Sequence, residues 1–64
     1  MKKYVLKDAD GNYYKDIDSR VKDPVITTKN KAEAGIFVVR GVSEDFIWVL
    51  SMVYGHKFEL EELM

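Results

Sequence analysis

The chain contains no cysteine and only one histidine among its 64 residues, and both scarcities exclude common ways of stabilising a small domain. Without cysteine there are no disulfide bonds and no thiolate zinc sites, and one imidazole does not build a metal cluster. A chain of this length buries only about 60% of the surface that its unfolded form exposes, so its stability margin is small. We therefore expect one domain over residues 1–64, no metal or cofactor, and outside support from a partner chain.

Charge of neither sign predominates, with 10 Lys and Arg residues against 11 Asp and Glu residues. Direct nucleic-acid binding is not expected, because it depends on a clustered basic face. No stretch reaches the length of a membrane span, and Lys7 and Asp8 interrupt a start that resembles a signal peptide. Since 47% of the residues are hydrophobic, the chain is too apolar for a disordered tail. These features predict a soluble cytoplasmic domain without membrane contact.

The first third of the chain predicts a β-hairpin. Residues 2–8 and 12–17 are short segments rich in Tyr, Val, Leu and Ile, and Asp10 and Gly11 lie between them. Asp-Gly is a strong hairpin signal, because a type I′ turn needs positive φ at both central positions.

The register of this hairpin has two alternatives. A two-residue turn pairs Lys7 with Tyr14, whereas a three-residue loop pairs Leu6 with Tyr14 and exchanges the two faces. The choice decides which tyrosines are buried and which can contact a ligand or partner. The tyrosines concerned are Tyr4, Tyr13 and Tyr14.

The middle of the chain predicts short elements. Residues 25–27 form either a short strand or an anchor into the core, after a polar loop that contains the only proline. Thr27 or Thr28 then offers an N-cap for a helix of one or two turns that ends near Gly35. Residues 36–40 are almost continuously apolar and rich in β-branched side chains, which predicts a strand with little solvent on either face.

The densest apolar run, residues 43–55, contains the only tryptophan and predicts the main helix. Ser43 is expected to cap its first turn, where the helix dipole favours the negative charges of Glu44 and Asp45. Gly55 is expected to end the helix in a left-handed conformation.

This helix is apolar around much of its circumference. The residues at the spacing that faces a core are Phe46, Val49, Leu50 and Val53. Trp48 and Met52 lie one turn apart on another face, and Trp, Tyr and Met are enriched where protein surfaces meet. Burial of this second face within the domain is the open alternative. The predicted interface consists of Trp48, Met52, Ile47 and Tyr54.

A final strand is predicted where Phe58 and Leu60 alternate with Glu59 and Glu61. Together, the segments predict an α+β fold in which a small antiparallel sheet of three to four strands packs against the main helix. The expected order of elements is β-β-(short α)-β-α-β.

One motif resembles the start of a calcium-binding EF-hand loop, because carboxylates recur at Asp8 and Asp10 before Asn12. Its glycine stands at the fourth loop position instead of the sixth, and Ser19 occupies the position of the closing glutamate. We interpret the segment as a hairpin turn and predict no metal site.

No catalytic residues are predicted. Imidazole titrates near neutrality and can act as a general base, but no motif links a serine or an acid to His56. We interpret His56 as a capping or surface residue that suits the negative helix end. The acidic tail consists of Glu59, Glu61 and Glu62. A mimic of nucleic acid imitates the row of backbone phosphates, and three carboxylates are few for that function.

The N-terminal half of the chain resembles a known group of proteins. The segment Tyr4–Tyr14, followed by Thr28–Ala34 and Phe37, is similar to small uncharacterised proteins of phages and prophages of Gram-positive bacteria. Those proteins open with a tyrosine-bearing hairpin, and an Ala-rich helical turn then leads to a phenylalanine. The resemblance implies a phage context, in which small proteins often bind and inhibit host machinery, including defence nucleases. It carries over no catalytic residue.

The sequence thus leads to a functional hypothesis. We expect a non-catalytic protein-binding module, phage-encoded and anti-CRISPR-like, that inhibits or redirects a host protein. Homodimerisation through Trp48 and Met52 is the linked expectation. The alternatives are a self-associating structural or accessory phage protein, and a small-ligand or nucleotide-binding protein that uses its tyrosines as a stacking surface.

Overall fold

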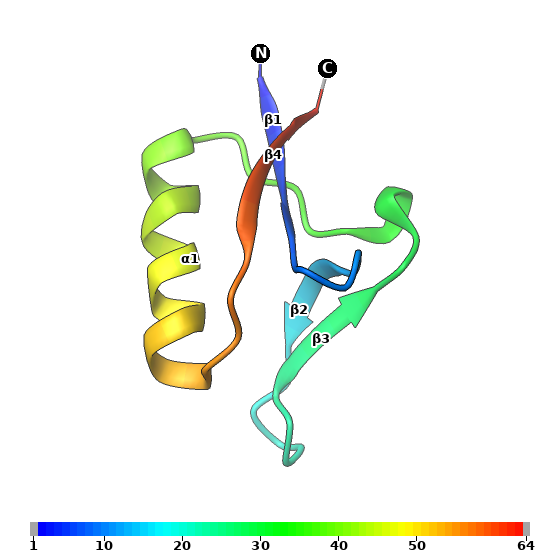
Figure 1. Cartoon of the computed structure of the whole chain (residues 1–64), viewed down its shortest axis with the longest axis vertical. Helices are drawn as coiled ribbons and strands as arrows, with labels where there is room; N and C mark the ends of the chain where they lie inside the picture. Colours follow the sequence, from blue (N-terminus) through cyan, green and yellow to red (C-terminus); the bar gives the residue numbers. More distant parts are fainter. Residues whose placement is uncertain (1, 64) are drawn as a thin grey trace.

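The computed structural model describes residues 2–63 as a four-stranded antiparallel sheet with one main helix. The elements in chain order are β1 (Lys3–Lys7), β2 (Tyr13–Ile17), β3 (Val25–Thr28), the 3-10 helix η1 (Lys31–Glu33), α1 (Arg40–Tyr54) and β4 (Glu59–Leu63). The strands lie in the order β3-β2-β1-β4, so the last strand pairs with the first (Figure 1). This confirms the predicted α+β class, although the third strand precedes the short helix instead of following it.

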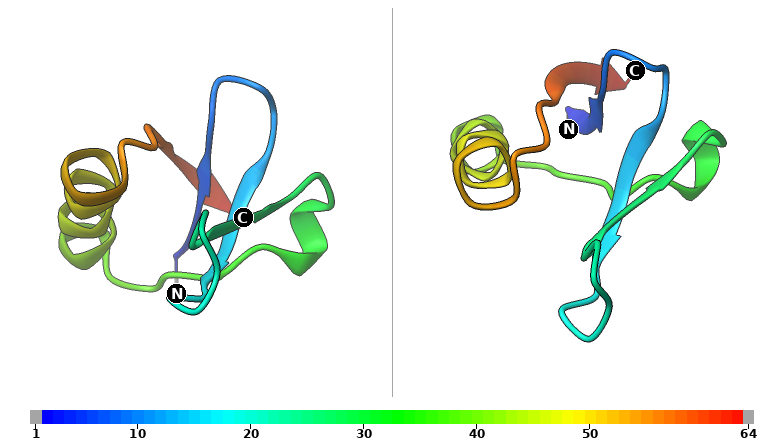
Figure 2. Two further views of the ribbon diagram at one scale, coloured as in Figure 1. Left: turned by 90° about the horizontal axis from the view of Figure 1, so that it is seen from below. Right: turned by 60° about the horizontal axis from the view of Figure 1, so that its bottom comes forward.

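Helix α1 packs against β1 and β4, on one side of the molecule. Strands β2 and β3 form a ribbon that extends away from the helix, as the two further views in Figure 2 show. The helix therefore covers half of the sheet, and its outer side faces away from all four strands.

The hairpin between β1 and β2 adopts the register of the three-residue loop. Lys7 pairs with Tyr13, and the Asp8 N–H donates to the Asn12 carbonyl at 2.8 Å. Residues 9–11 therefore form the loop. Leu6 and Tyr14 belong to the same register, and both are buried in the core.

The side chain of Asp8 organises this loop. Its Oδ1 accepts hydrogen bonds from the backbone N–H groups of Asp10 and Asn12, each at 2.9 Å. Gly11 has a φ of 84°, in the left-handed region that glycine adopts without steric cost. The Asp8 carboxylate thus serves the hairpin turn. The turn is not the predicted type I′, because Gly11 has a positive φ and Asp10 does not.

Beyond this pair the two strands separate, and residues 35–37 lie between them. Tyr4 and Phe37 exchange two main-chain hydrogen bonds of 2.7 and 2.9 Å, and the Gly35 N–H donates to the Tyr14 carbonyl at 2.9 Å. The approach at Gly35 is close, because a Cβ there would lie 3.1 Å from the carbonyl oxygen of Lys15. A side chain at this position would therefore need the Lys15 carbonyl and the Tyr14 ring to shift.

The predicted strand at residues 36–40 is wrong. Only Phe37 forms a bridge, and Ile36, Val38 and Val39 are exposed. β-branched residues fit a pleated surface, but they do not determine where a chain finds a partner strand. Here the inserted segment meets the side of β1 that faces β2, and it gains only the Phe37 position there before α1 begins.

The N-cap of the short helix η1 is Asn30, not a threonine. The Asn30 Oδ1 accepts from the N–H of Ala32 at 3.0 Å, and its Nδ2 donates to Glu33 Oε2 at 3.0 Å. Thr28 Oγ1 supports this cap by accepting from the Asn30 N–H at 3.1 Å. Asparagine provides both an acceptor and a donor, and therefore replaces the predicted cap at Thr27 or Thr28.

Helix α1 begins at Arg40, three residues before the predicted start at Ser43. Val39 occupies the N-cap position, and Ser43 is fully buried with its Oγ donating to the Val39 carbonyl at 2.8 Å. Glu44 and Asp45 therefore lie beyond the first turn, so the prediction that they interact with the helix dipole is wrong. The other end is as predicted, because Gly55 closes the helix with a φ of 67°.

The core-facing stripe of α1 is offset from the predicted one. Ser43, Phe46, Ile47 and Leu50 follow the i, i+3, i+4, i+7 spacing and face the sheet. Val53, predicted to be buried, is 65% exposed. The small, polar Ser43 disguised this stripe, because its burial depends on a hydrogen bond that the sequence does not display.

The core forms around one aromatic side chain from β2. Its buried cluster consists of Leu6, Tyr14, Val25, Leu50 and Phe58. The ring of Tyr14 lies 5.1 Å from that of Phe46 and 6.2 Å from that of Phe58, both edge-on. Tyr14 thereby joins β2 to α1 and to the segment before β4.

Candidate functional site

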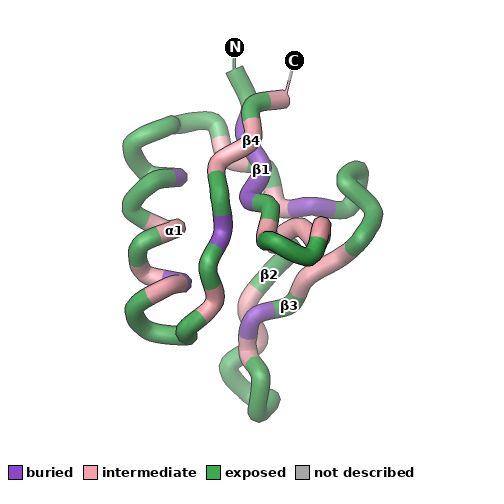
Figure 3. The backbone as a smooth tube through the Cα atoms, viewed as in Figure 1, coloured by how far each residue is buried: buried purple, intermediate pink, exposed green. Residues whose placement is uncertain are grey.

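The outer side of α1 carries a broad apolar surface. We call it the α1 outer face; its centre is the exposed pair Trp48 and Met52, one turn apart, while the exposed Val42 and Val53 lie about a third of the way round the helix from Trp48. Trp48 is 63% exposed and Met52 is 65% exposed. Figure 3 shows exposed positions along the side of the helix that points away from the sheet. Neighbouring exposed apolar side chains such as Trp48 and Met52 are typical of interaction sites in soluble domains.

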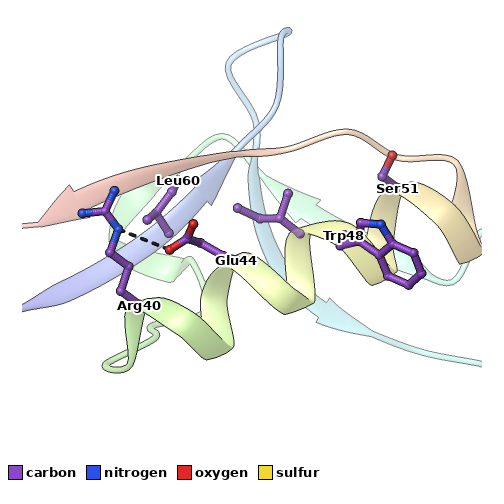
Figure 4. A pocket seen from close by; sticks show the side chains of 6 residues that line it. Arg40, Glu44, Trp48, Ser51 and Leu60 are labelled. Atoms are coloured by element: carbon purple, nitrogen blue, oxygen red, sulfur yellow. Dashed lines mark ion pairs between the residues drawn. The ribbon is translucent and has the colours of Figure 1, made fainter.

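A groove of about 460 Å³ runs between α1 and β4 and adjoins this face. Its lining residues are Arg40, Glu44, Ile47, Trp48, Ser51 and Leu60. In Figure 4, Arg40, Glu44 and Leu60 lie at one end and Trp48 and Ser51 at the other. The Arg40 Nε lies 3.4 Å from Glu44 Oε1, so the charges at the first end compensate each other.

Trp48 connects the groove to the α1 outer face, since it belongs to both. Of the four residues predicted as an interface, Trp48 and Met52 are exposed as a neighbouring pair on this side of the helix. Ile47 packs against the core with one side and lines the groove with the other. Tyr54 lies partly exposed at the last residue of α1.

The three tyrosines proposed as a ligand or partner contact do not share one exposed surface. Tyr4 and Tyr14 are buried, while Tyr13 is half-buried and has the ammonium of Lys31 at 5.9 Å from its ring centre. Burial raises the pKa of Tyr14, and the negative charge of Asp16 contributes in the same direction. Stacking of a ligand on Tyr4 or Tyr14 would require the core to open.

His56 has a buried partner that the sequence did not indicate. Its Nε2 lies 3.3 Å from Oδ2 of Asp8, and its ring stacks on Phe58 with centres 4.5 Å apart. Burial opposes ionisation of Asp8, but the N–H groups of Asn12 and Asp10 and the imidazole outweigh it, so the pKa of Asp8 is lowered. Asp8 already holds the hairpin loop, so this contact joins the loop to the end of α1.

The remaining surface features are less suited to binding a partner than the α1 outer face. A second hollow of about 260 Å³ lies beside the hairpin loop and is lined by Lys7, Ala9, Lys57, Phe58 and Glu59. Within residues 2–63, histidine, aspartate and glutamate side chains do not gather in groups of three that could hold a metal ion. None of the helices described in that range has the length and apolar content needed to cross a membrane.

Comparisons of this chain with protein-family models, with curated proteins and with solved structures give no match. The candidate site is therefore defined by its own geometry.

Proposed function

We propose that this protein is a small, non-catalytic protein-binding module that docks its partner on the α1 outer face and the adjoining groove. The observation that supports the proposal is the position of Trp48, whose ring is exposed where the apolar helix surface meets the groove. Tryptophan in such a place is the residue type most often found at the energetic centre of an interface.

The resemblance of the N-terminal half to small phage proteins suggests the setting of this activity. In that setting the module acts in the cytoplasm of a bacterial host, and its partner is a host protein whose surface it occupies and thereby inhibits or redirects. Defence nucleases are one class of such partners.

The proposal is tested by retention of a partner from host lysate on the immobilised protein. We expect one stoichiometric partner, and we expect the double variant Trp48→Ala, Met52→Ala to lose it. The matched control is Val21→Ala, which shortens another exposed apolar side chain far from α1 in sequence and leaves binding unchanged. Equal retention by all three proteins, with unchanged circular dichroism, would contradict the proposal.

A second candidate function is self-association as a structural or accessory protein. It is favoured by the same exposed pair, because Trp48 and Met52 on two copies can bury apolar surface against each other. Sedimentation equilibrium distinguishes the two functions. Dimerisation that is abolished by the double variant, together with no retained host protein, supports self-association; a monomer at high concentration excludes it.

A further inference from the structure

Strand β4 has a neighbour on only one side within residues 2–63. All five of its positions pair with β1, from Glu59 opposite Lys7 to Leu63 opposite Lys3. It is the last strand in the order β3-β2-β1-β4, so its other side is an open edge. Open edges provide unpaired main-chain groups that another strand can bind.

The hydrogen bonds of β1 identify which groups of β4 face this edge. Tyr4 exchanges both of its main-chain bonds with Phe37, so its N–H and C=O point away from β4. In an antiparallel pair the main-chain groups of successive residues alternate in direction. The pair Tyr4–Glu62, and likewise Leu6–Leu60, is therefore not hydrogen-bonded. It follows that the N–H and C=O groups of Leu60 and Glu62 point to the open edge.

The groove lies on the same part of β4. Leu60, whose main-chain groups face the edge, also lines the groove with its side chain, together with Ile47 of α1. A strand that paired with Leu60 and Glu62 would place alternate side chains on the helix side of the sheet. Those side chains would enter the groove between α1 and β4, so the edge and the groove form one composite site.

Charge indicates the chemistry of the added strand. β4 contains Glu59, Glu61 and Glu62, of which Glu59 and Glu62 are exposed. Lys7 stands opposite Glu59, the Lys2 Nζ lies 3.5 Å from Glu62 Oε1, and Lys31 forms an ion pair with Glu61. The strand that already pairs with β4 is β1, which has a lysine at each end and apolar residues between them.

A second copy of β4 fits this edge poorly. Three of its five residues are glutamate, so two such strands side by side would bring like charges together across the pair, which is destabilising. A lysine-rich or arginine-rich strand has the opposite effect. Its cations would lie against the exposed carboxylates of Glu59 and Glu62.

We infer that the open edge of β4 and the α1–β4 groove bind an extended, basic segment of the partner protein as a fifth strand of the sheet. This inference rests on the proposed function, since it assumes a protein partner. It adds the chemistry of the bound segment, in which Lys or Arg alternates with apolar residues. The main chain of the segment pairs with Leu60 and Glu62, and its apolar side chains enter the groove. Strand addition of this kind combines affinity from main-chain bonds with selectivity from side-chain pockets.

The test is selection from an mRNA-displayed library of random linear peptides on the immobilised protein. We expect enrichment of peptides in which Lys or Arg alternates with apolar residues. The enriched peptides should slow amide hydrogen exchange at Leu60 and Glu62 by about tenfold or more, which corresponds to formation of main-chain hydrogen bonds. Enrichment of acidic or uncharged peptides, or no enrichment at all, overturns the inference.

Variants at the edge give a second measurement on the enriched peptides. Glu62→Pro removes an outward N–H and is expected to weaken binding about tenfold, whereas the control Glu62→Gln keeps the N–H and costs only a few-fold. If Glu62→Pro disturbs the fold, the double variant Glu59→Lys, Glu62→Lys replaces it and should repel the same peptides. Unchanged affinity in a folded variant overturns the inference.

Failure of this inference is distinguishable from failure of the proposed function. Peptides that perturb the Trp48 indole and Met52 methyl signals, with the Leu60 and Glu62 amides unaffected, overturn strand addition and leave docking on α1 intact. The lysate experiment with the Trp48 and Met52 variant judges the proposed function by itself.

Discussion

Asp8 and His56 are 48 positions apart in the chain, and their side chains meet at 3.3 Å between Oδ2 and Nε2. The same carboxylate holds the hairpin loop through two backbone N–H groups, so one side chain links the start of the sheet to the end of the helix. Asp8 is largely buried, which gives this contact more weight than the exposed ion pairs elsewhere on the surface.

We predict that Asp8 makes the stability of the fold depend on pH in the acid range. Its pKa in the folded protein lies below the usual value of 3.8, so ionised Asp8 stabilises the fold above that value. This contribution is lost as the pH falls through the lowered pKa. Urea unfolding of the wild type and of Asp8→Asn should be measured between neutral and acid pH. We expect the free energy of unfolding to fall more steeply with decreasing pH in the wild type. Parallel curves would contradict the assignment.

The two roles of Asp8 can be separated by substitution. Asp8→Asn keeps an oxygen that accepts from the loop N–H groups and removes the charge next to His56. Asp8→Ala removes both, and we expect it to cost about 1–3 kcal/mol in the free energy of unfolding at neutral pH. Equal destabilisation by the two substitutions would show that the loop bonds contribute little.

The offset of the helix stripe predicts a clear difference between two apolar residues of α1. Leu50→Ala creates a cavity in the core and should lower the free energy of unfolding by about 2–5 kcal/mol. Val53→Ala, which was expected from the sequence to act similarly, should change it by no more than about 0.5 kcal/mol. Chemical denaturation of both variants provides the comparison, and similar losses would restore the predicted stripe.

A larger side chain at Ser43 also tests whether the core-facing stripe of α1 is offset from the predicted one. Ser43→Leu forces a large side chain into a fully buried position and should cost about 1–3 kcal/mol through overpacking. The control Val42→Leu enlarges an exposed neighbour on the same turn and should be nearly neutral. Thermal unfolding distinguishes them. A stabilised Ser43→Leu protein would mean that the helix has room to move away from the sheet.

Two glycines that look alike in the sequence should respond oppositely to alanine. A Cβ at Gly35 meets backbone at 3.1 Å, so Gly35→Ala should destabilise the fold. Gly41 lies within α1 with open space around it, and Gly41→Ala should stabilise the fold by roughly 0.5–1 kcal/mol through helix propensity. Differential scanning calorimetry of both variants measures the two signs. Equal shifts would argue against the insertion of residues 35–37.

Local signals in the sequence were sufficient for several elements. The Asp-Gly turn, the left-handed Gly55 and the alternation before Leu63 each depend on neighbouring residues alone, and the structure contains the hairpin, the helix end and β4 that they predict. The exposure of Trp48 and Met52 fits the same reasoning, because a short chain has little material with which to cover both sides of a helix.

The errors arose where a distant residue decides the outcome. Residues 36–40 have strand composition, but only Phe37 pairs with β1, on the side of β1 that its hairpin partner β2 also approaches. Ser43 looked like a cap because its bond to Val39 depends on where the helix starts. The partner of His56 was hidden for the same reason, since only the folded chain brings Asp8 to it.

The insertion of residues 35–37 has a consequence for how the fold holds together. Within residues 2–63, the ladder between β1 and β2 consists of the pair Lys7–Tyr13, and further main-chain bonds link the two halves of the sheet through residues 35–37. The ring of Tyr14 adds a side-chain connection, because it meets Phe46 and Phe58 across the divide. The coupling between the two halves is thus concentrated in the inserted segment and in the core around Tyr14. We expect loss of that ring to make it easier for the β2–β3 ribbon to separate from the helix with β1 and β4.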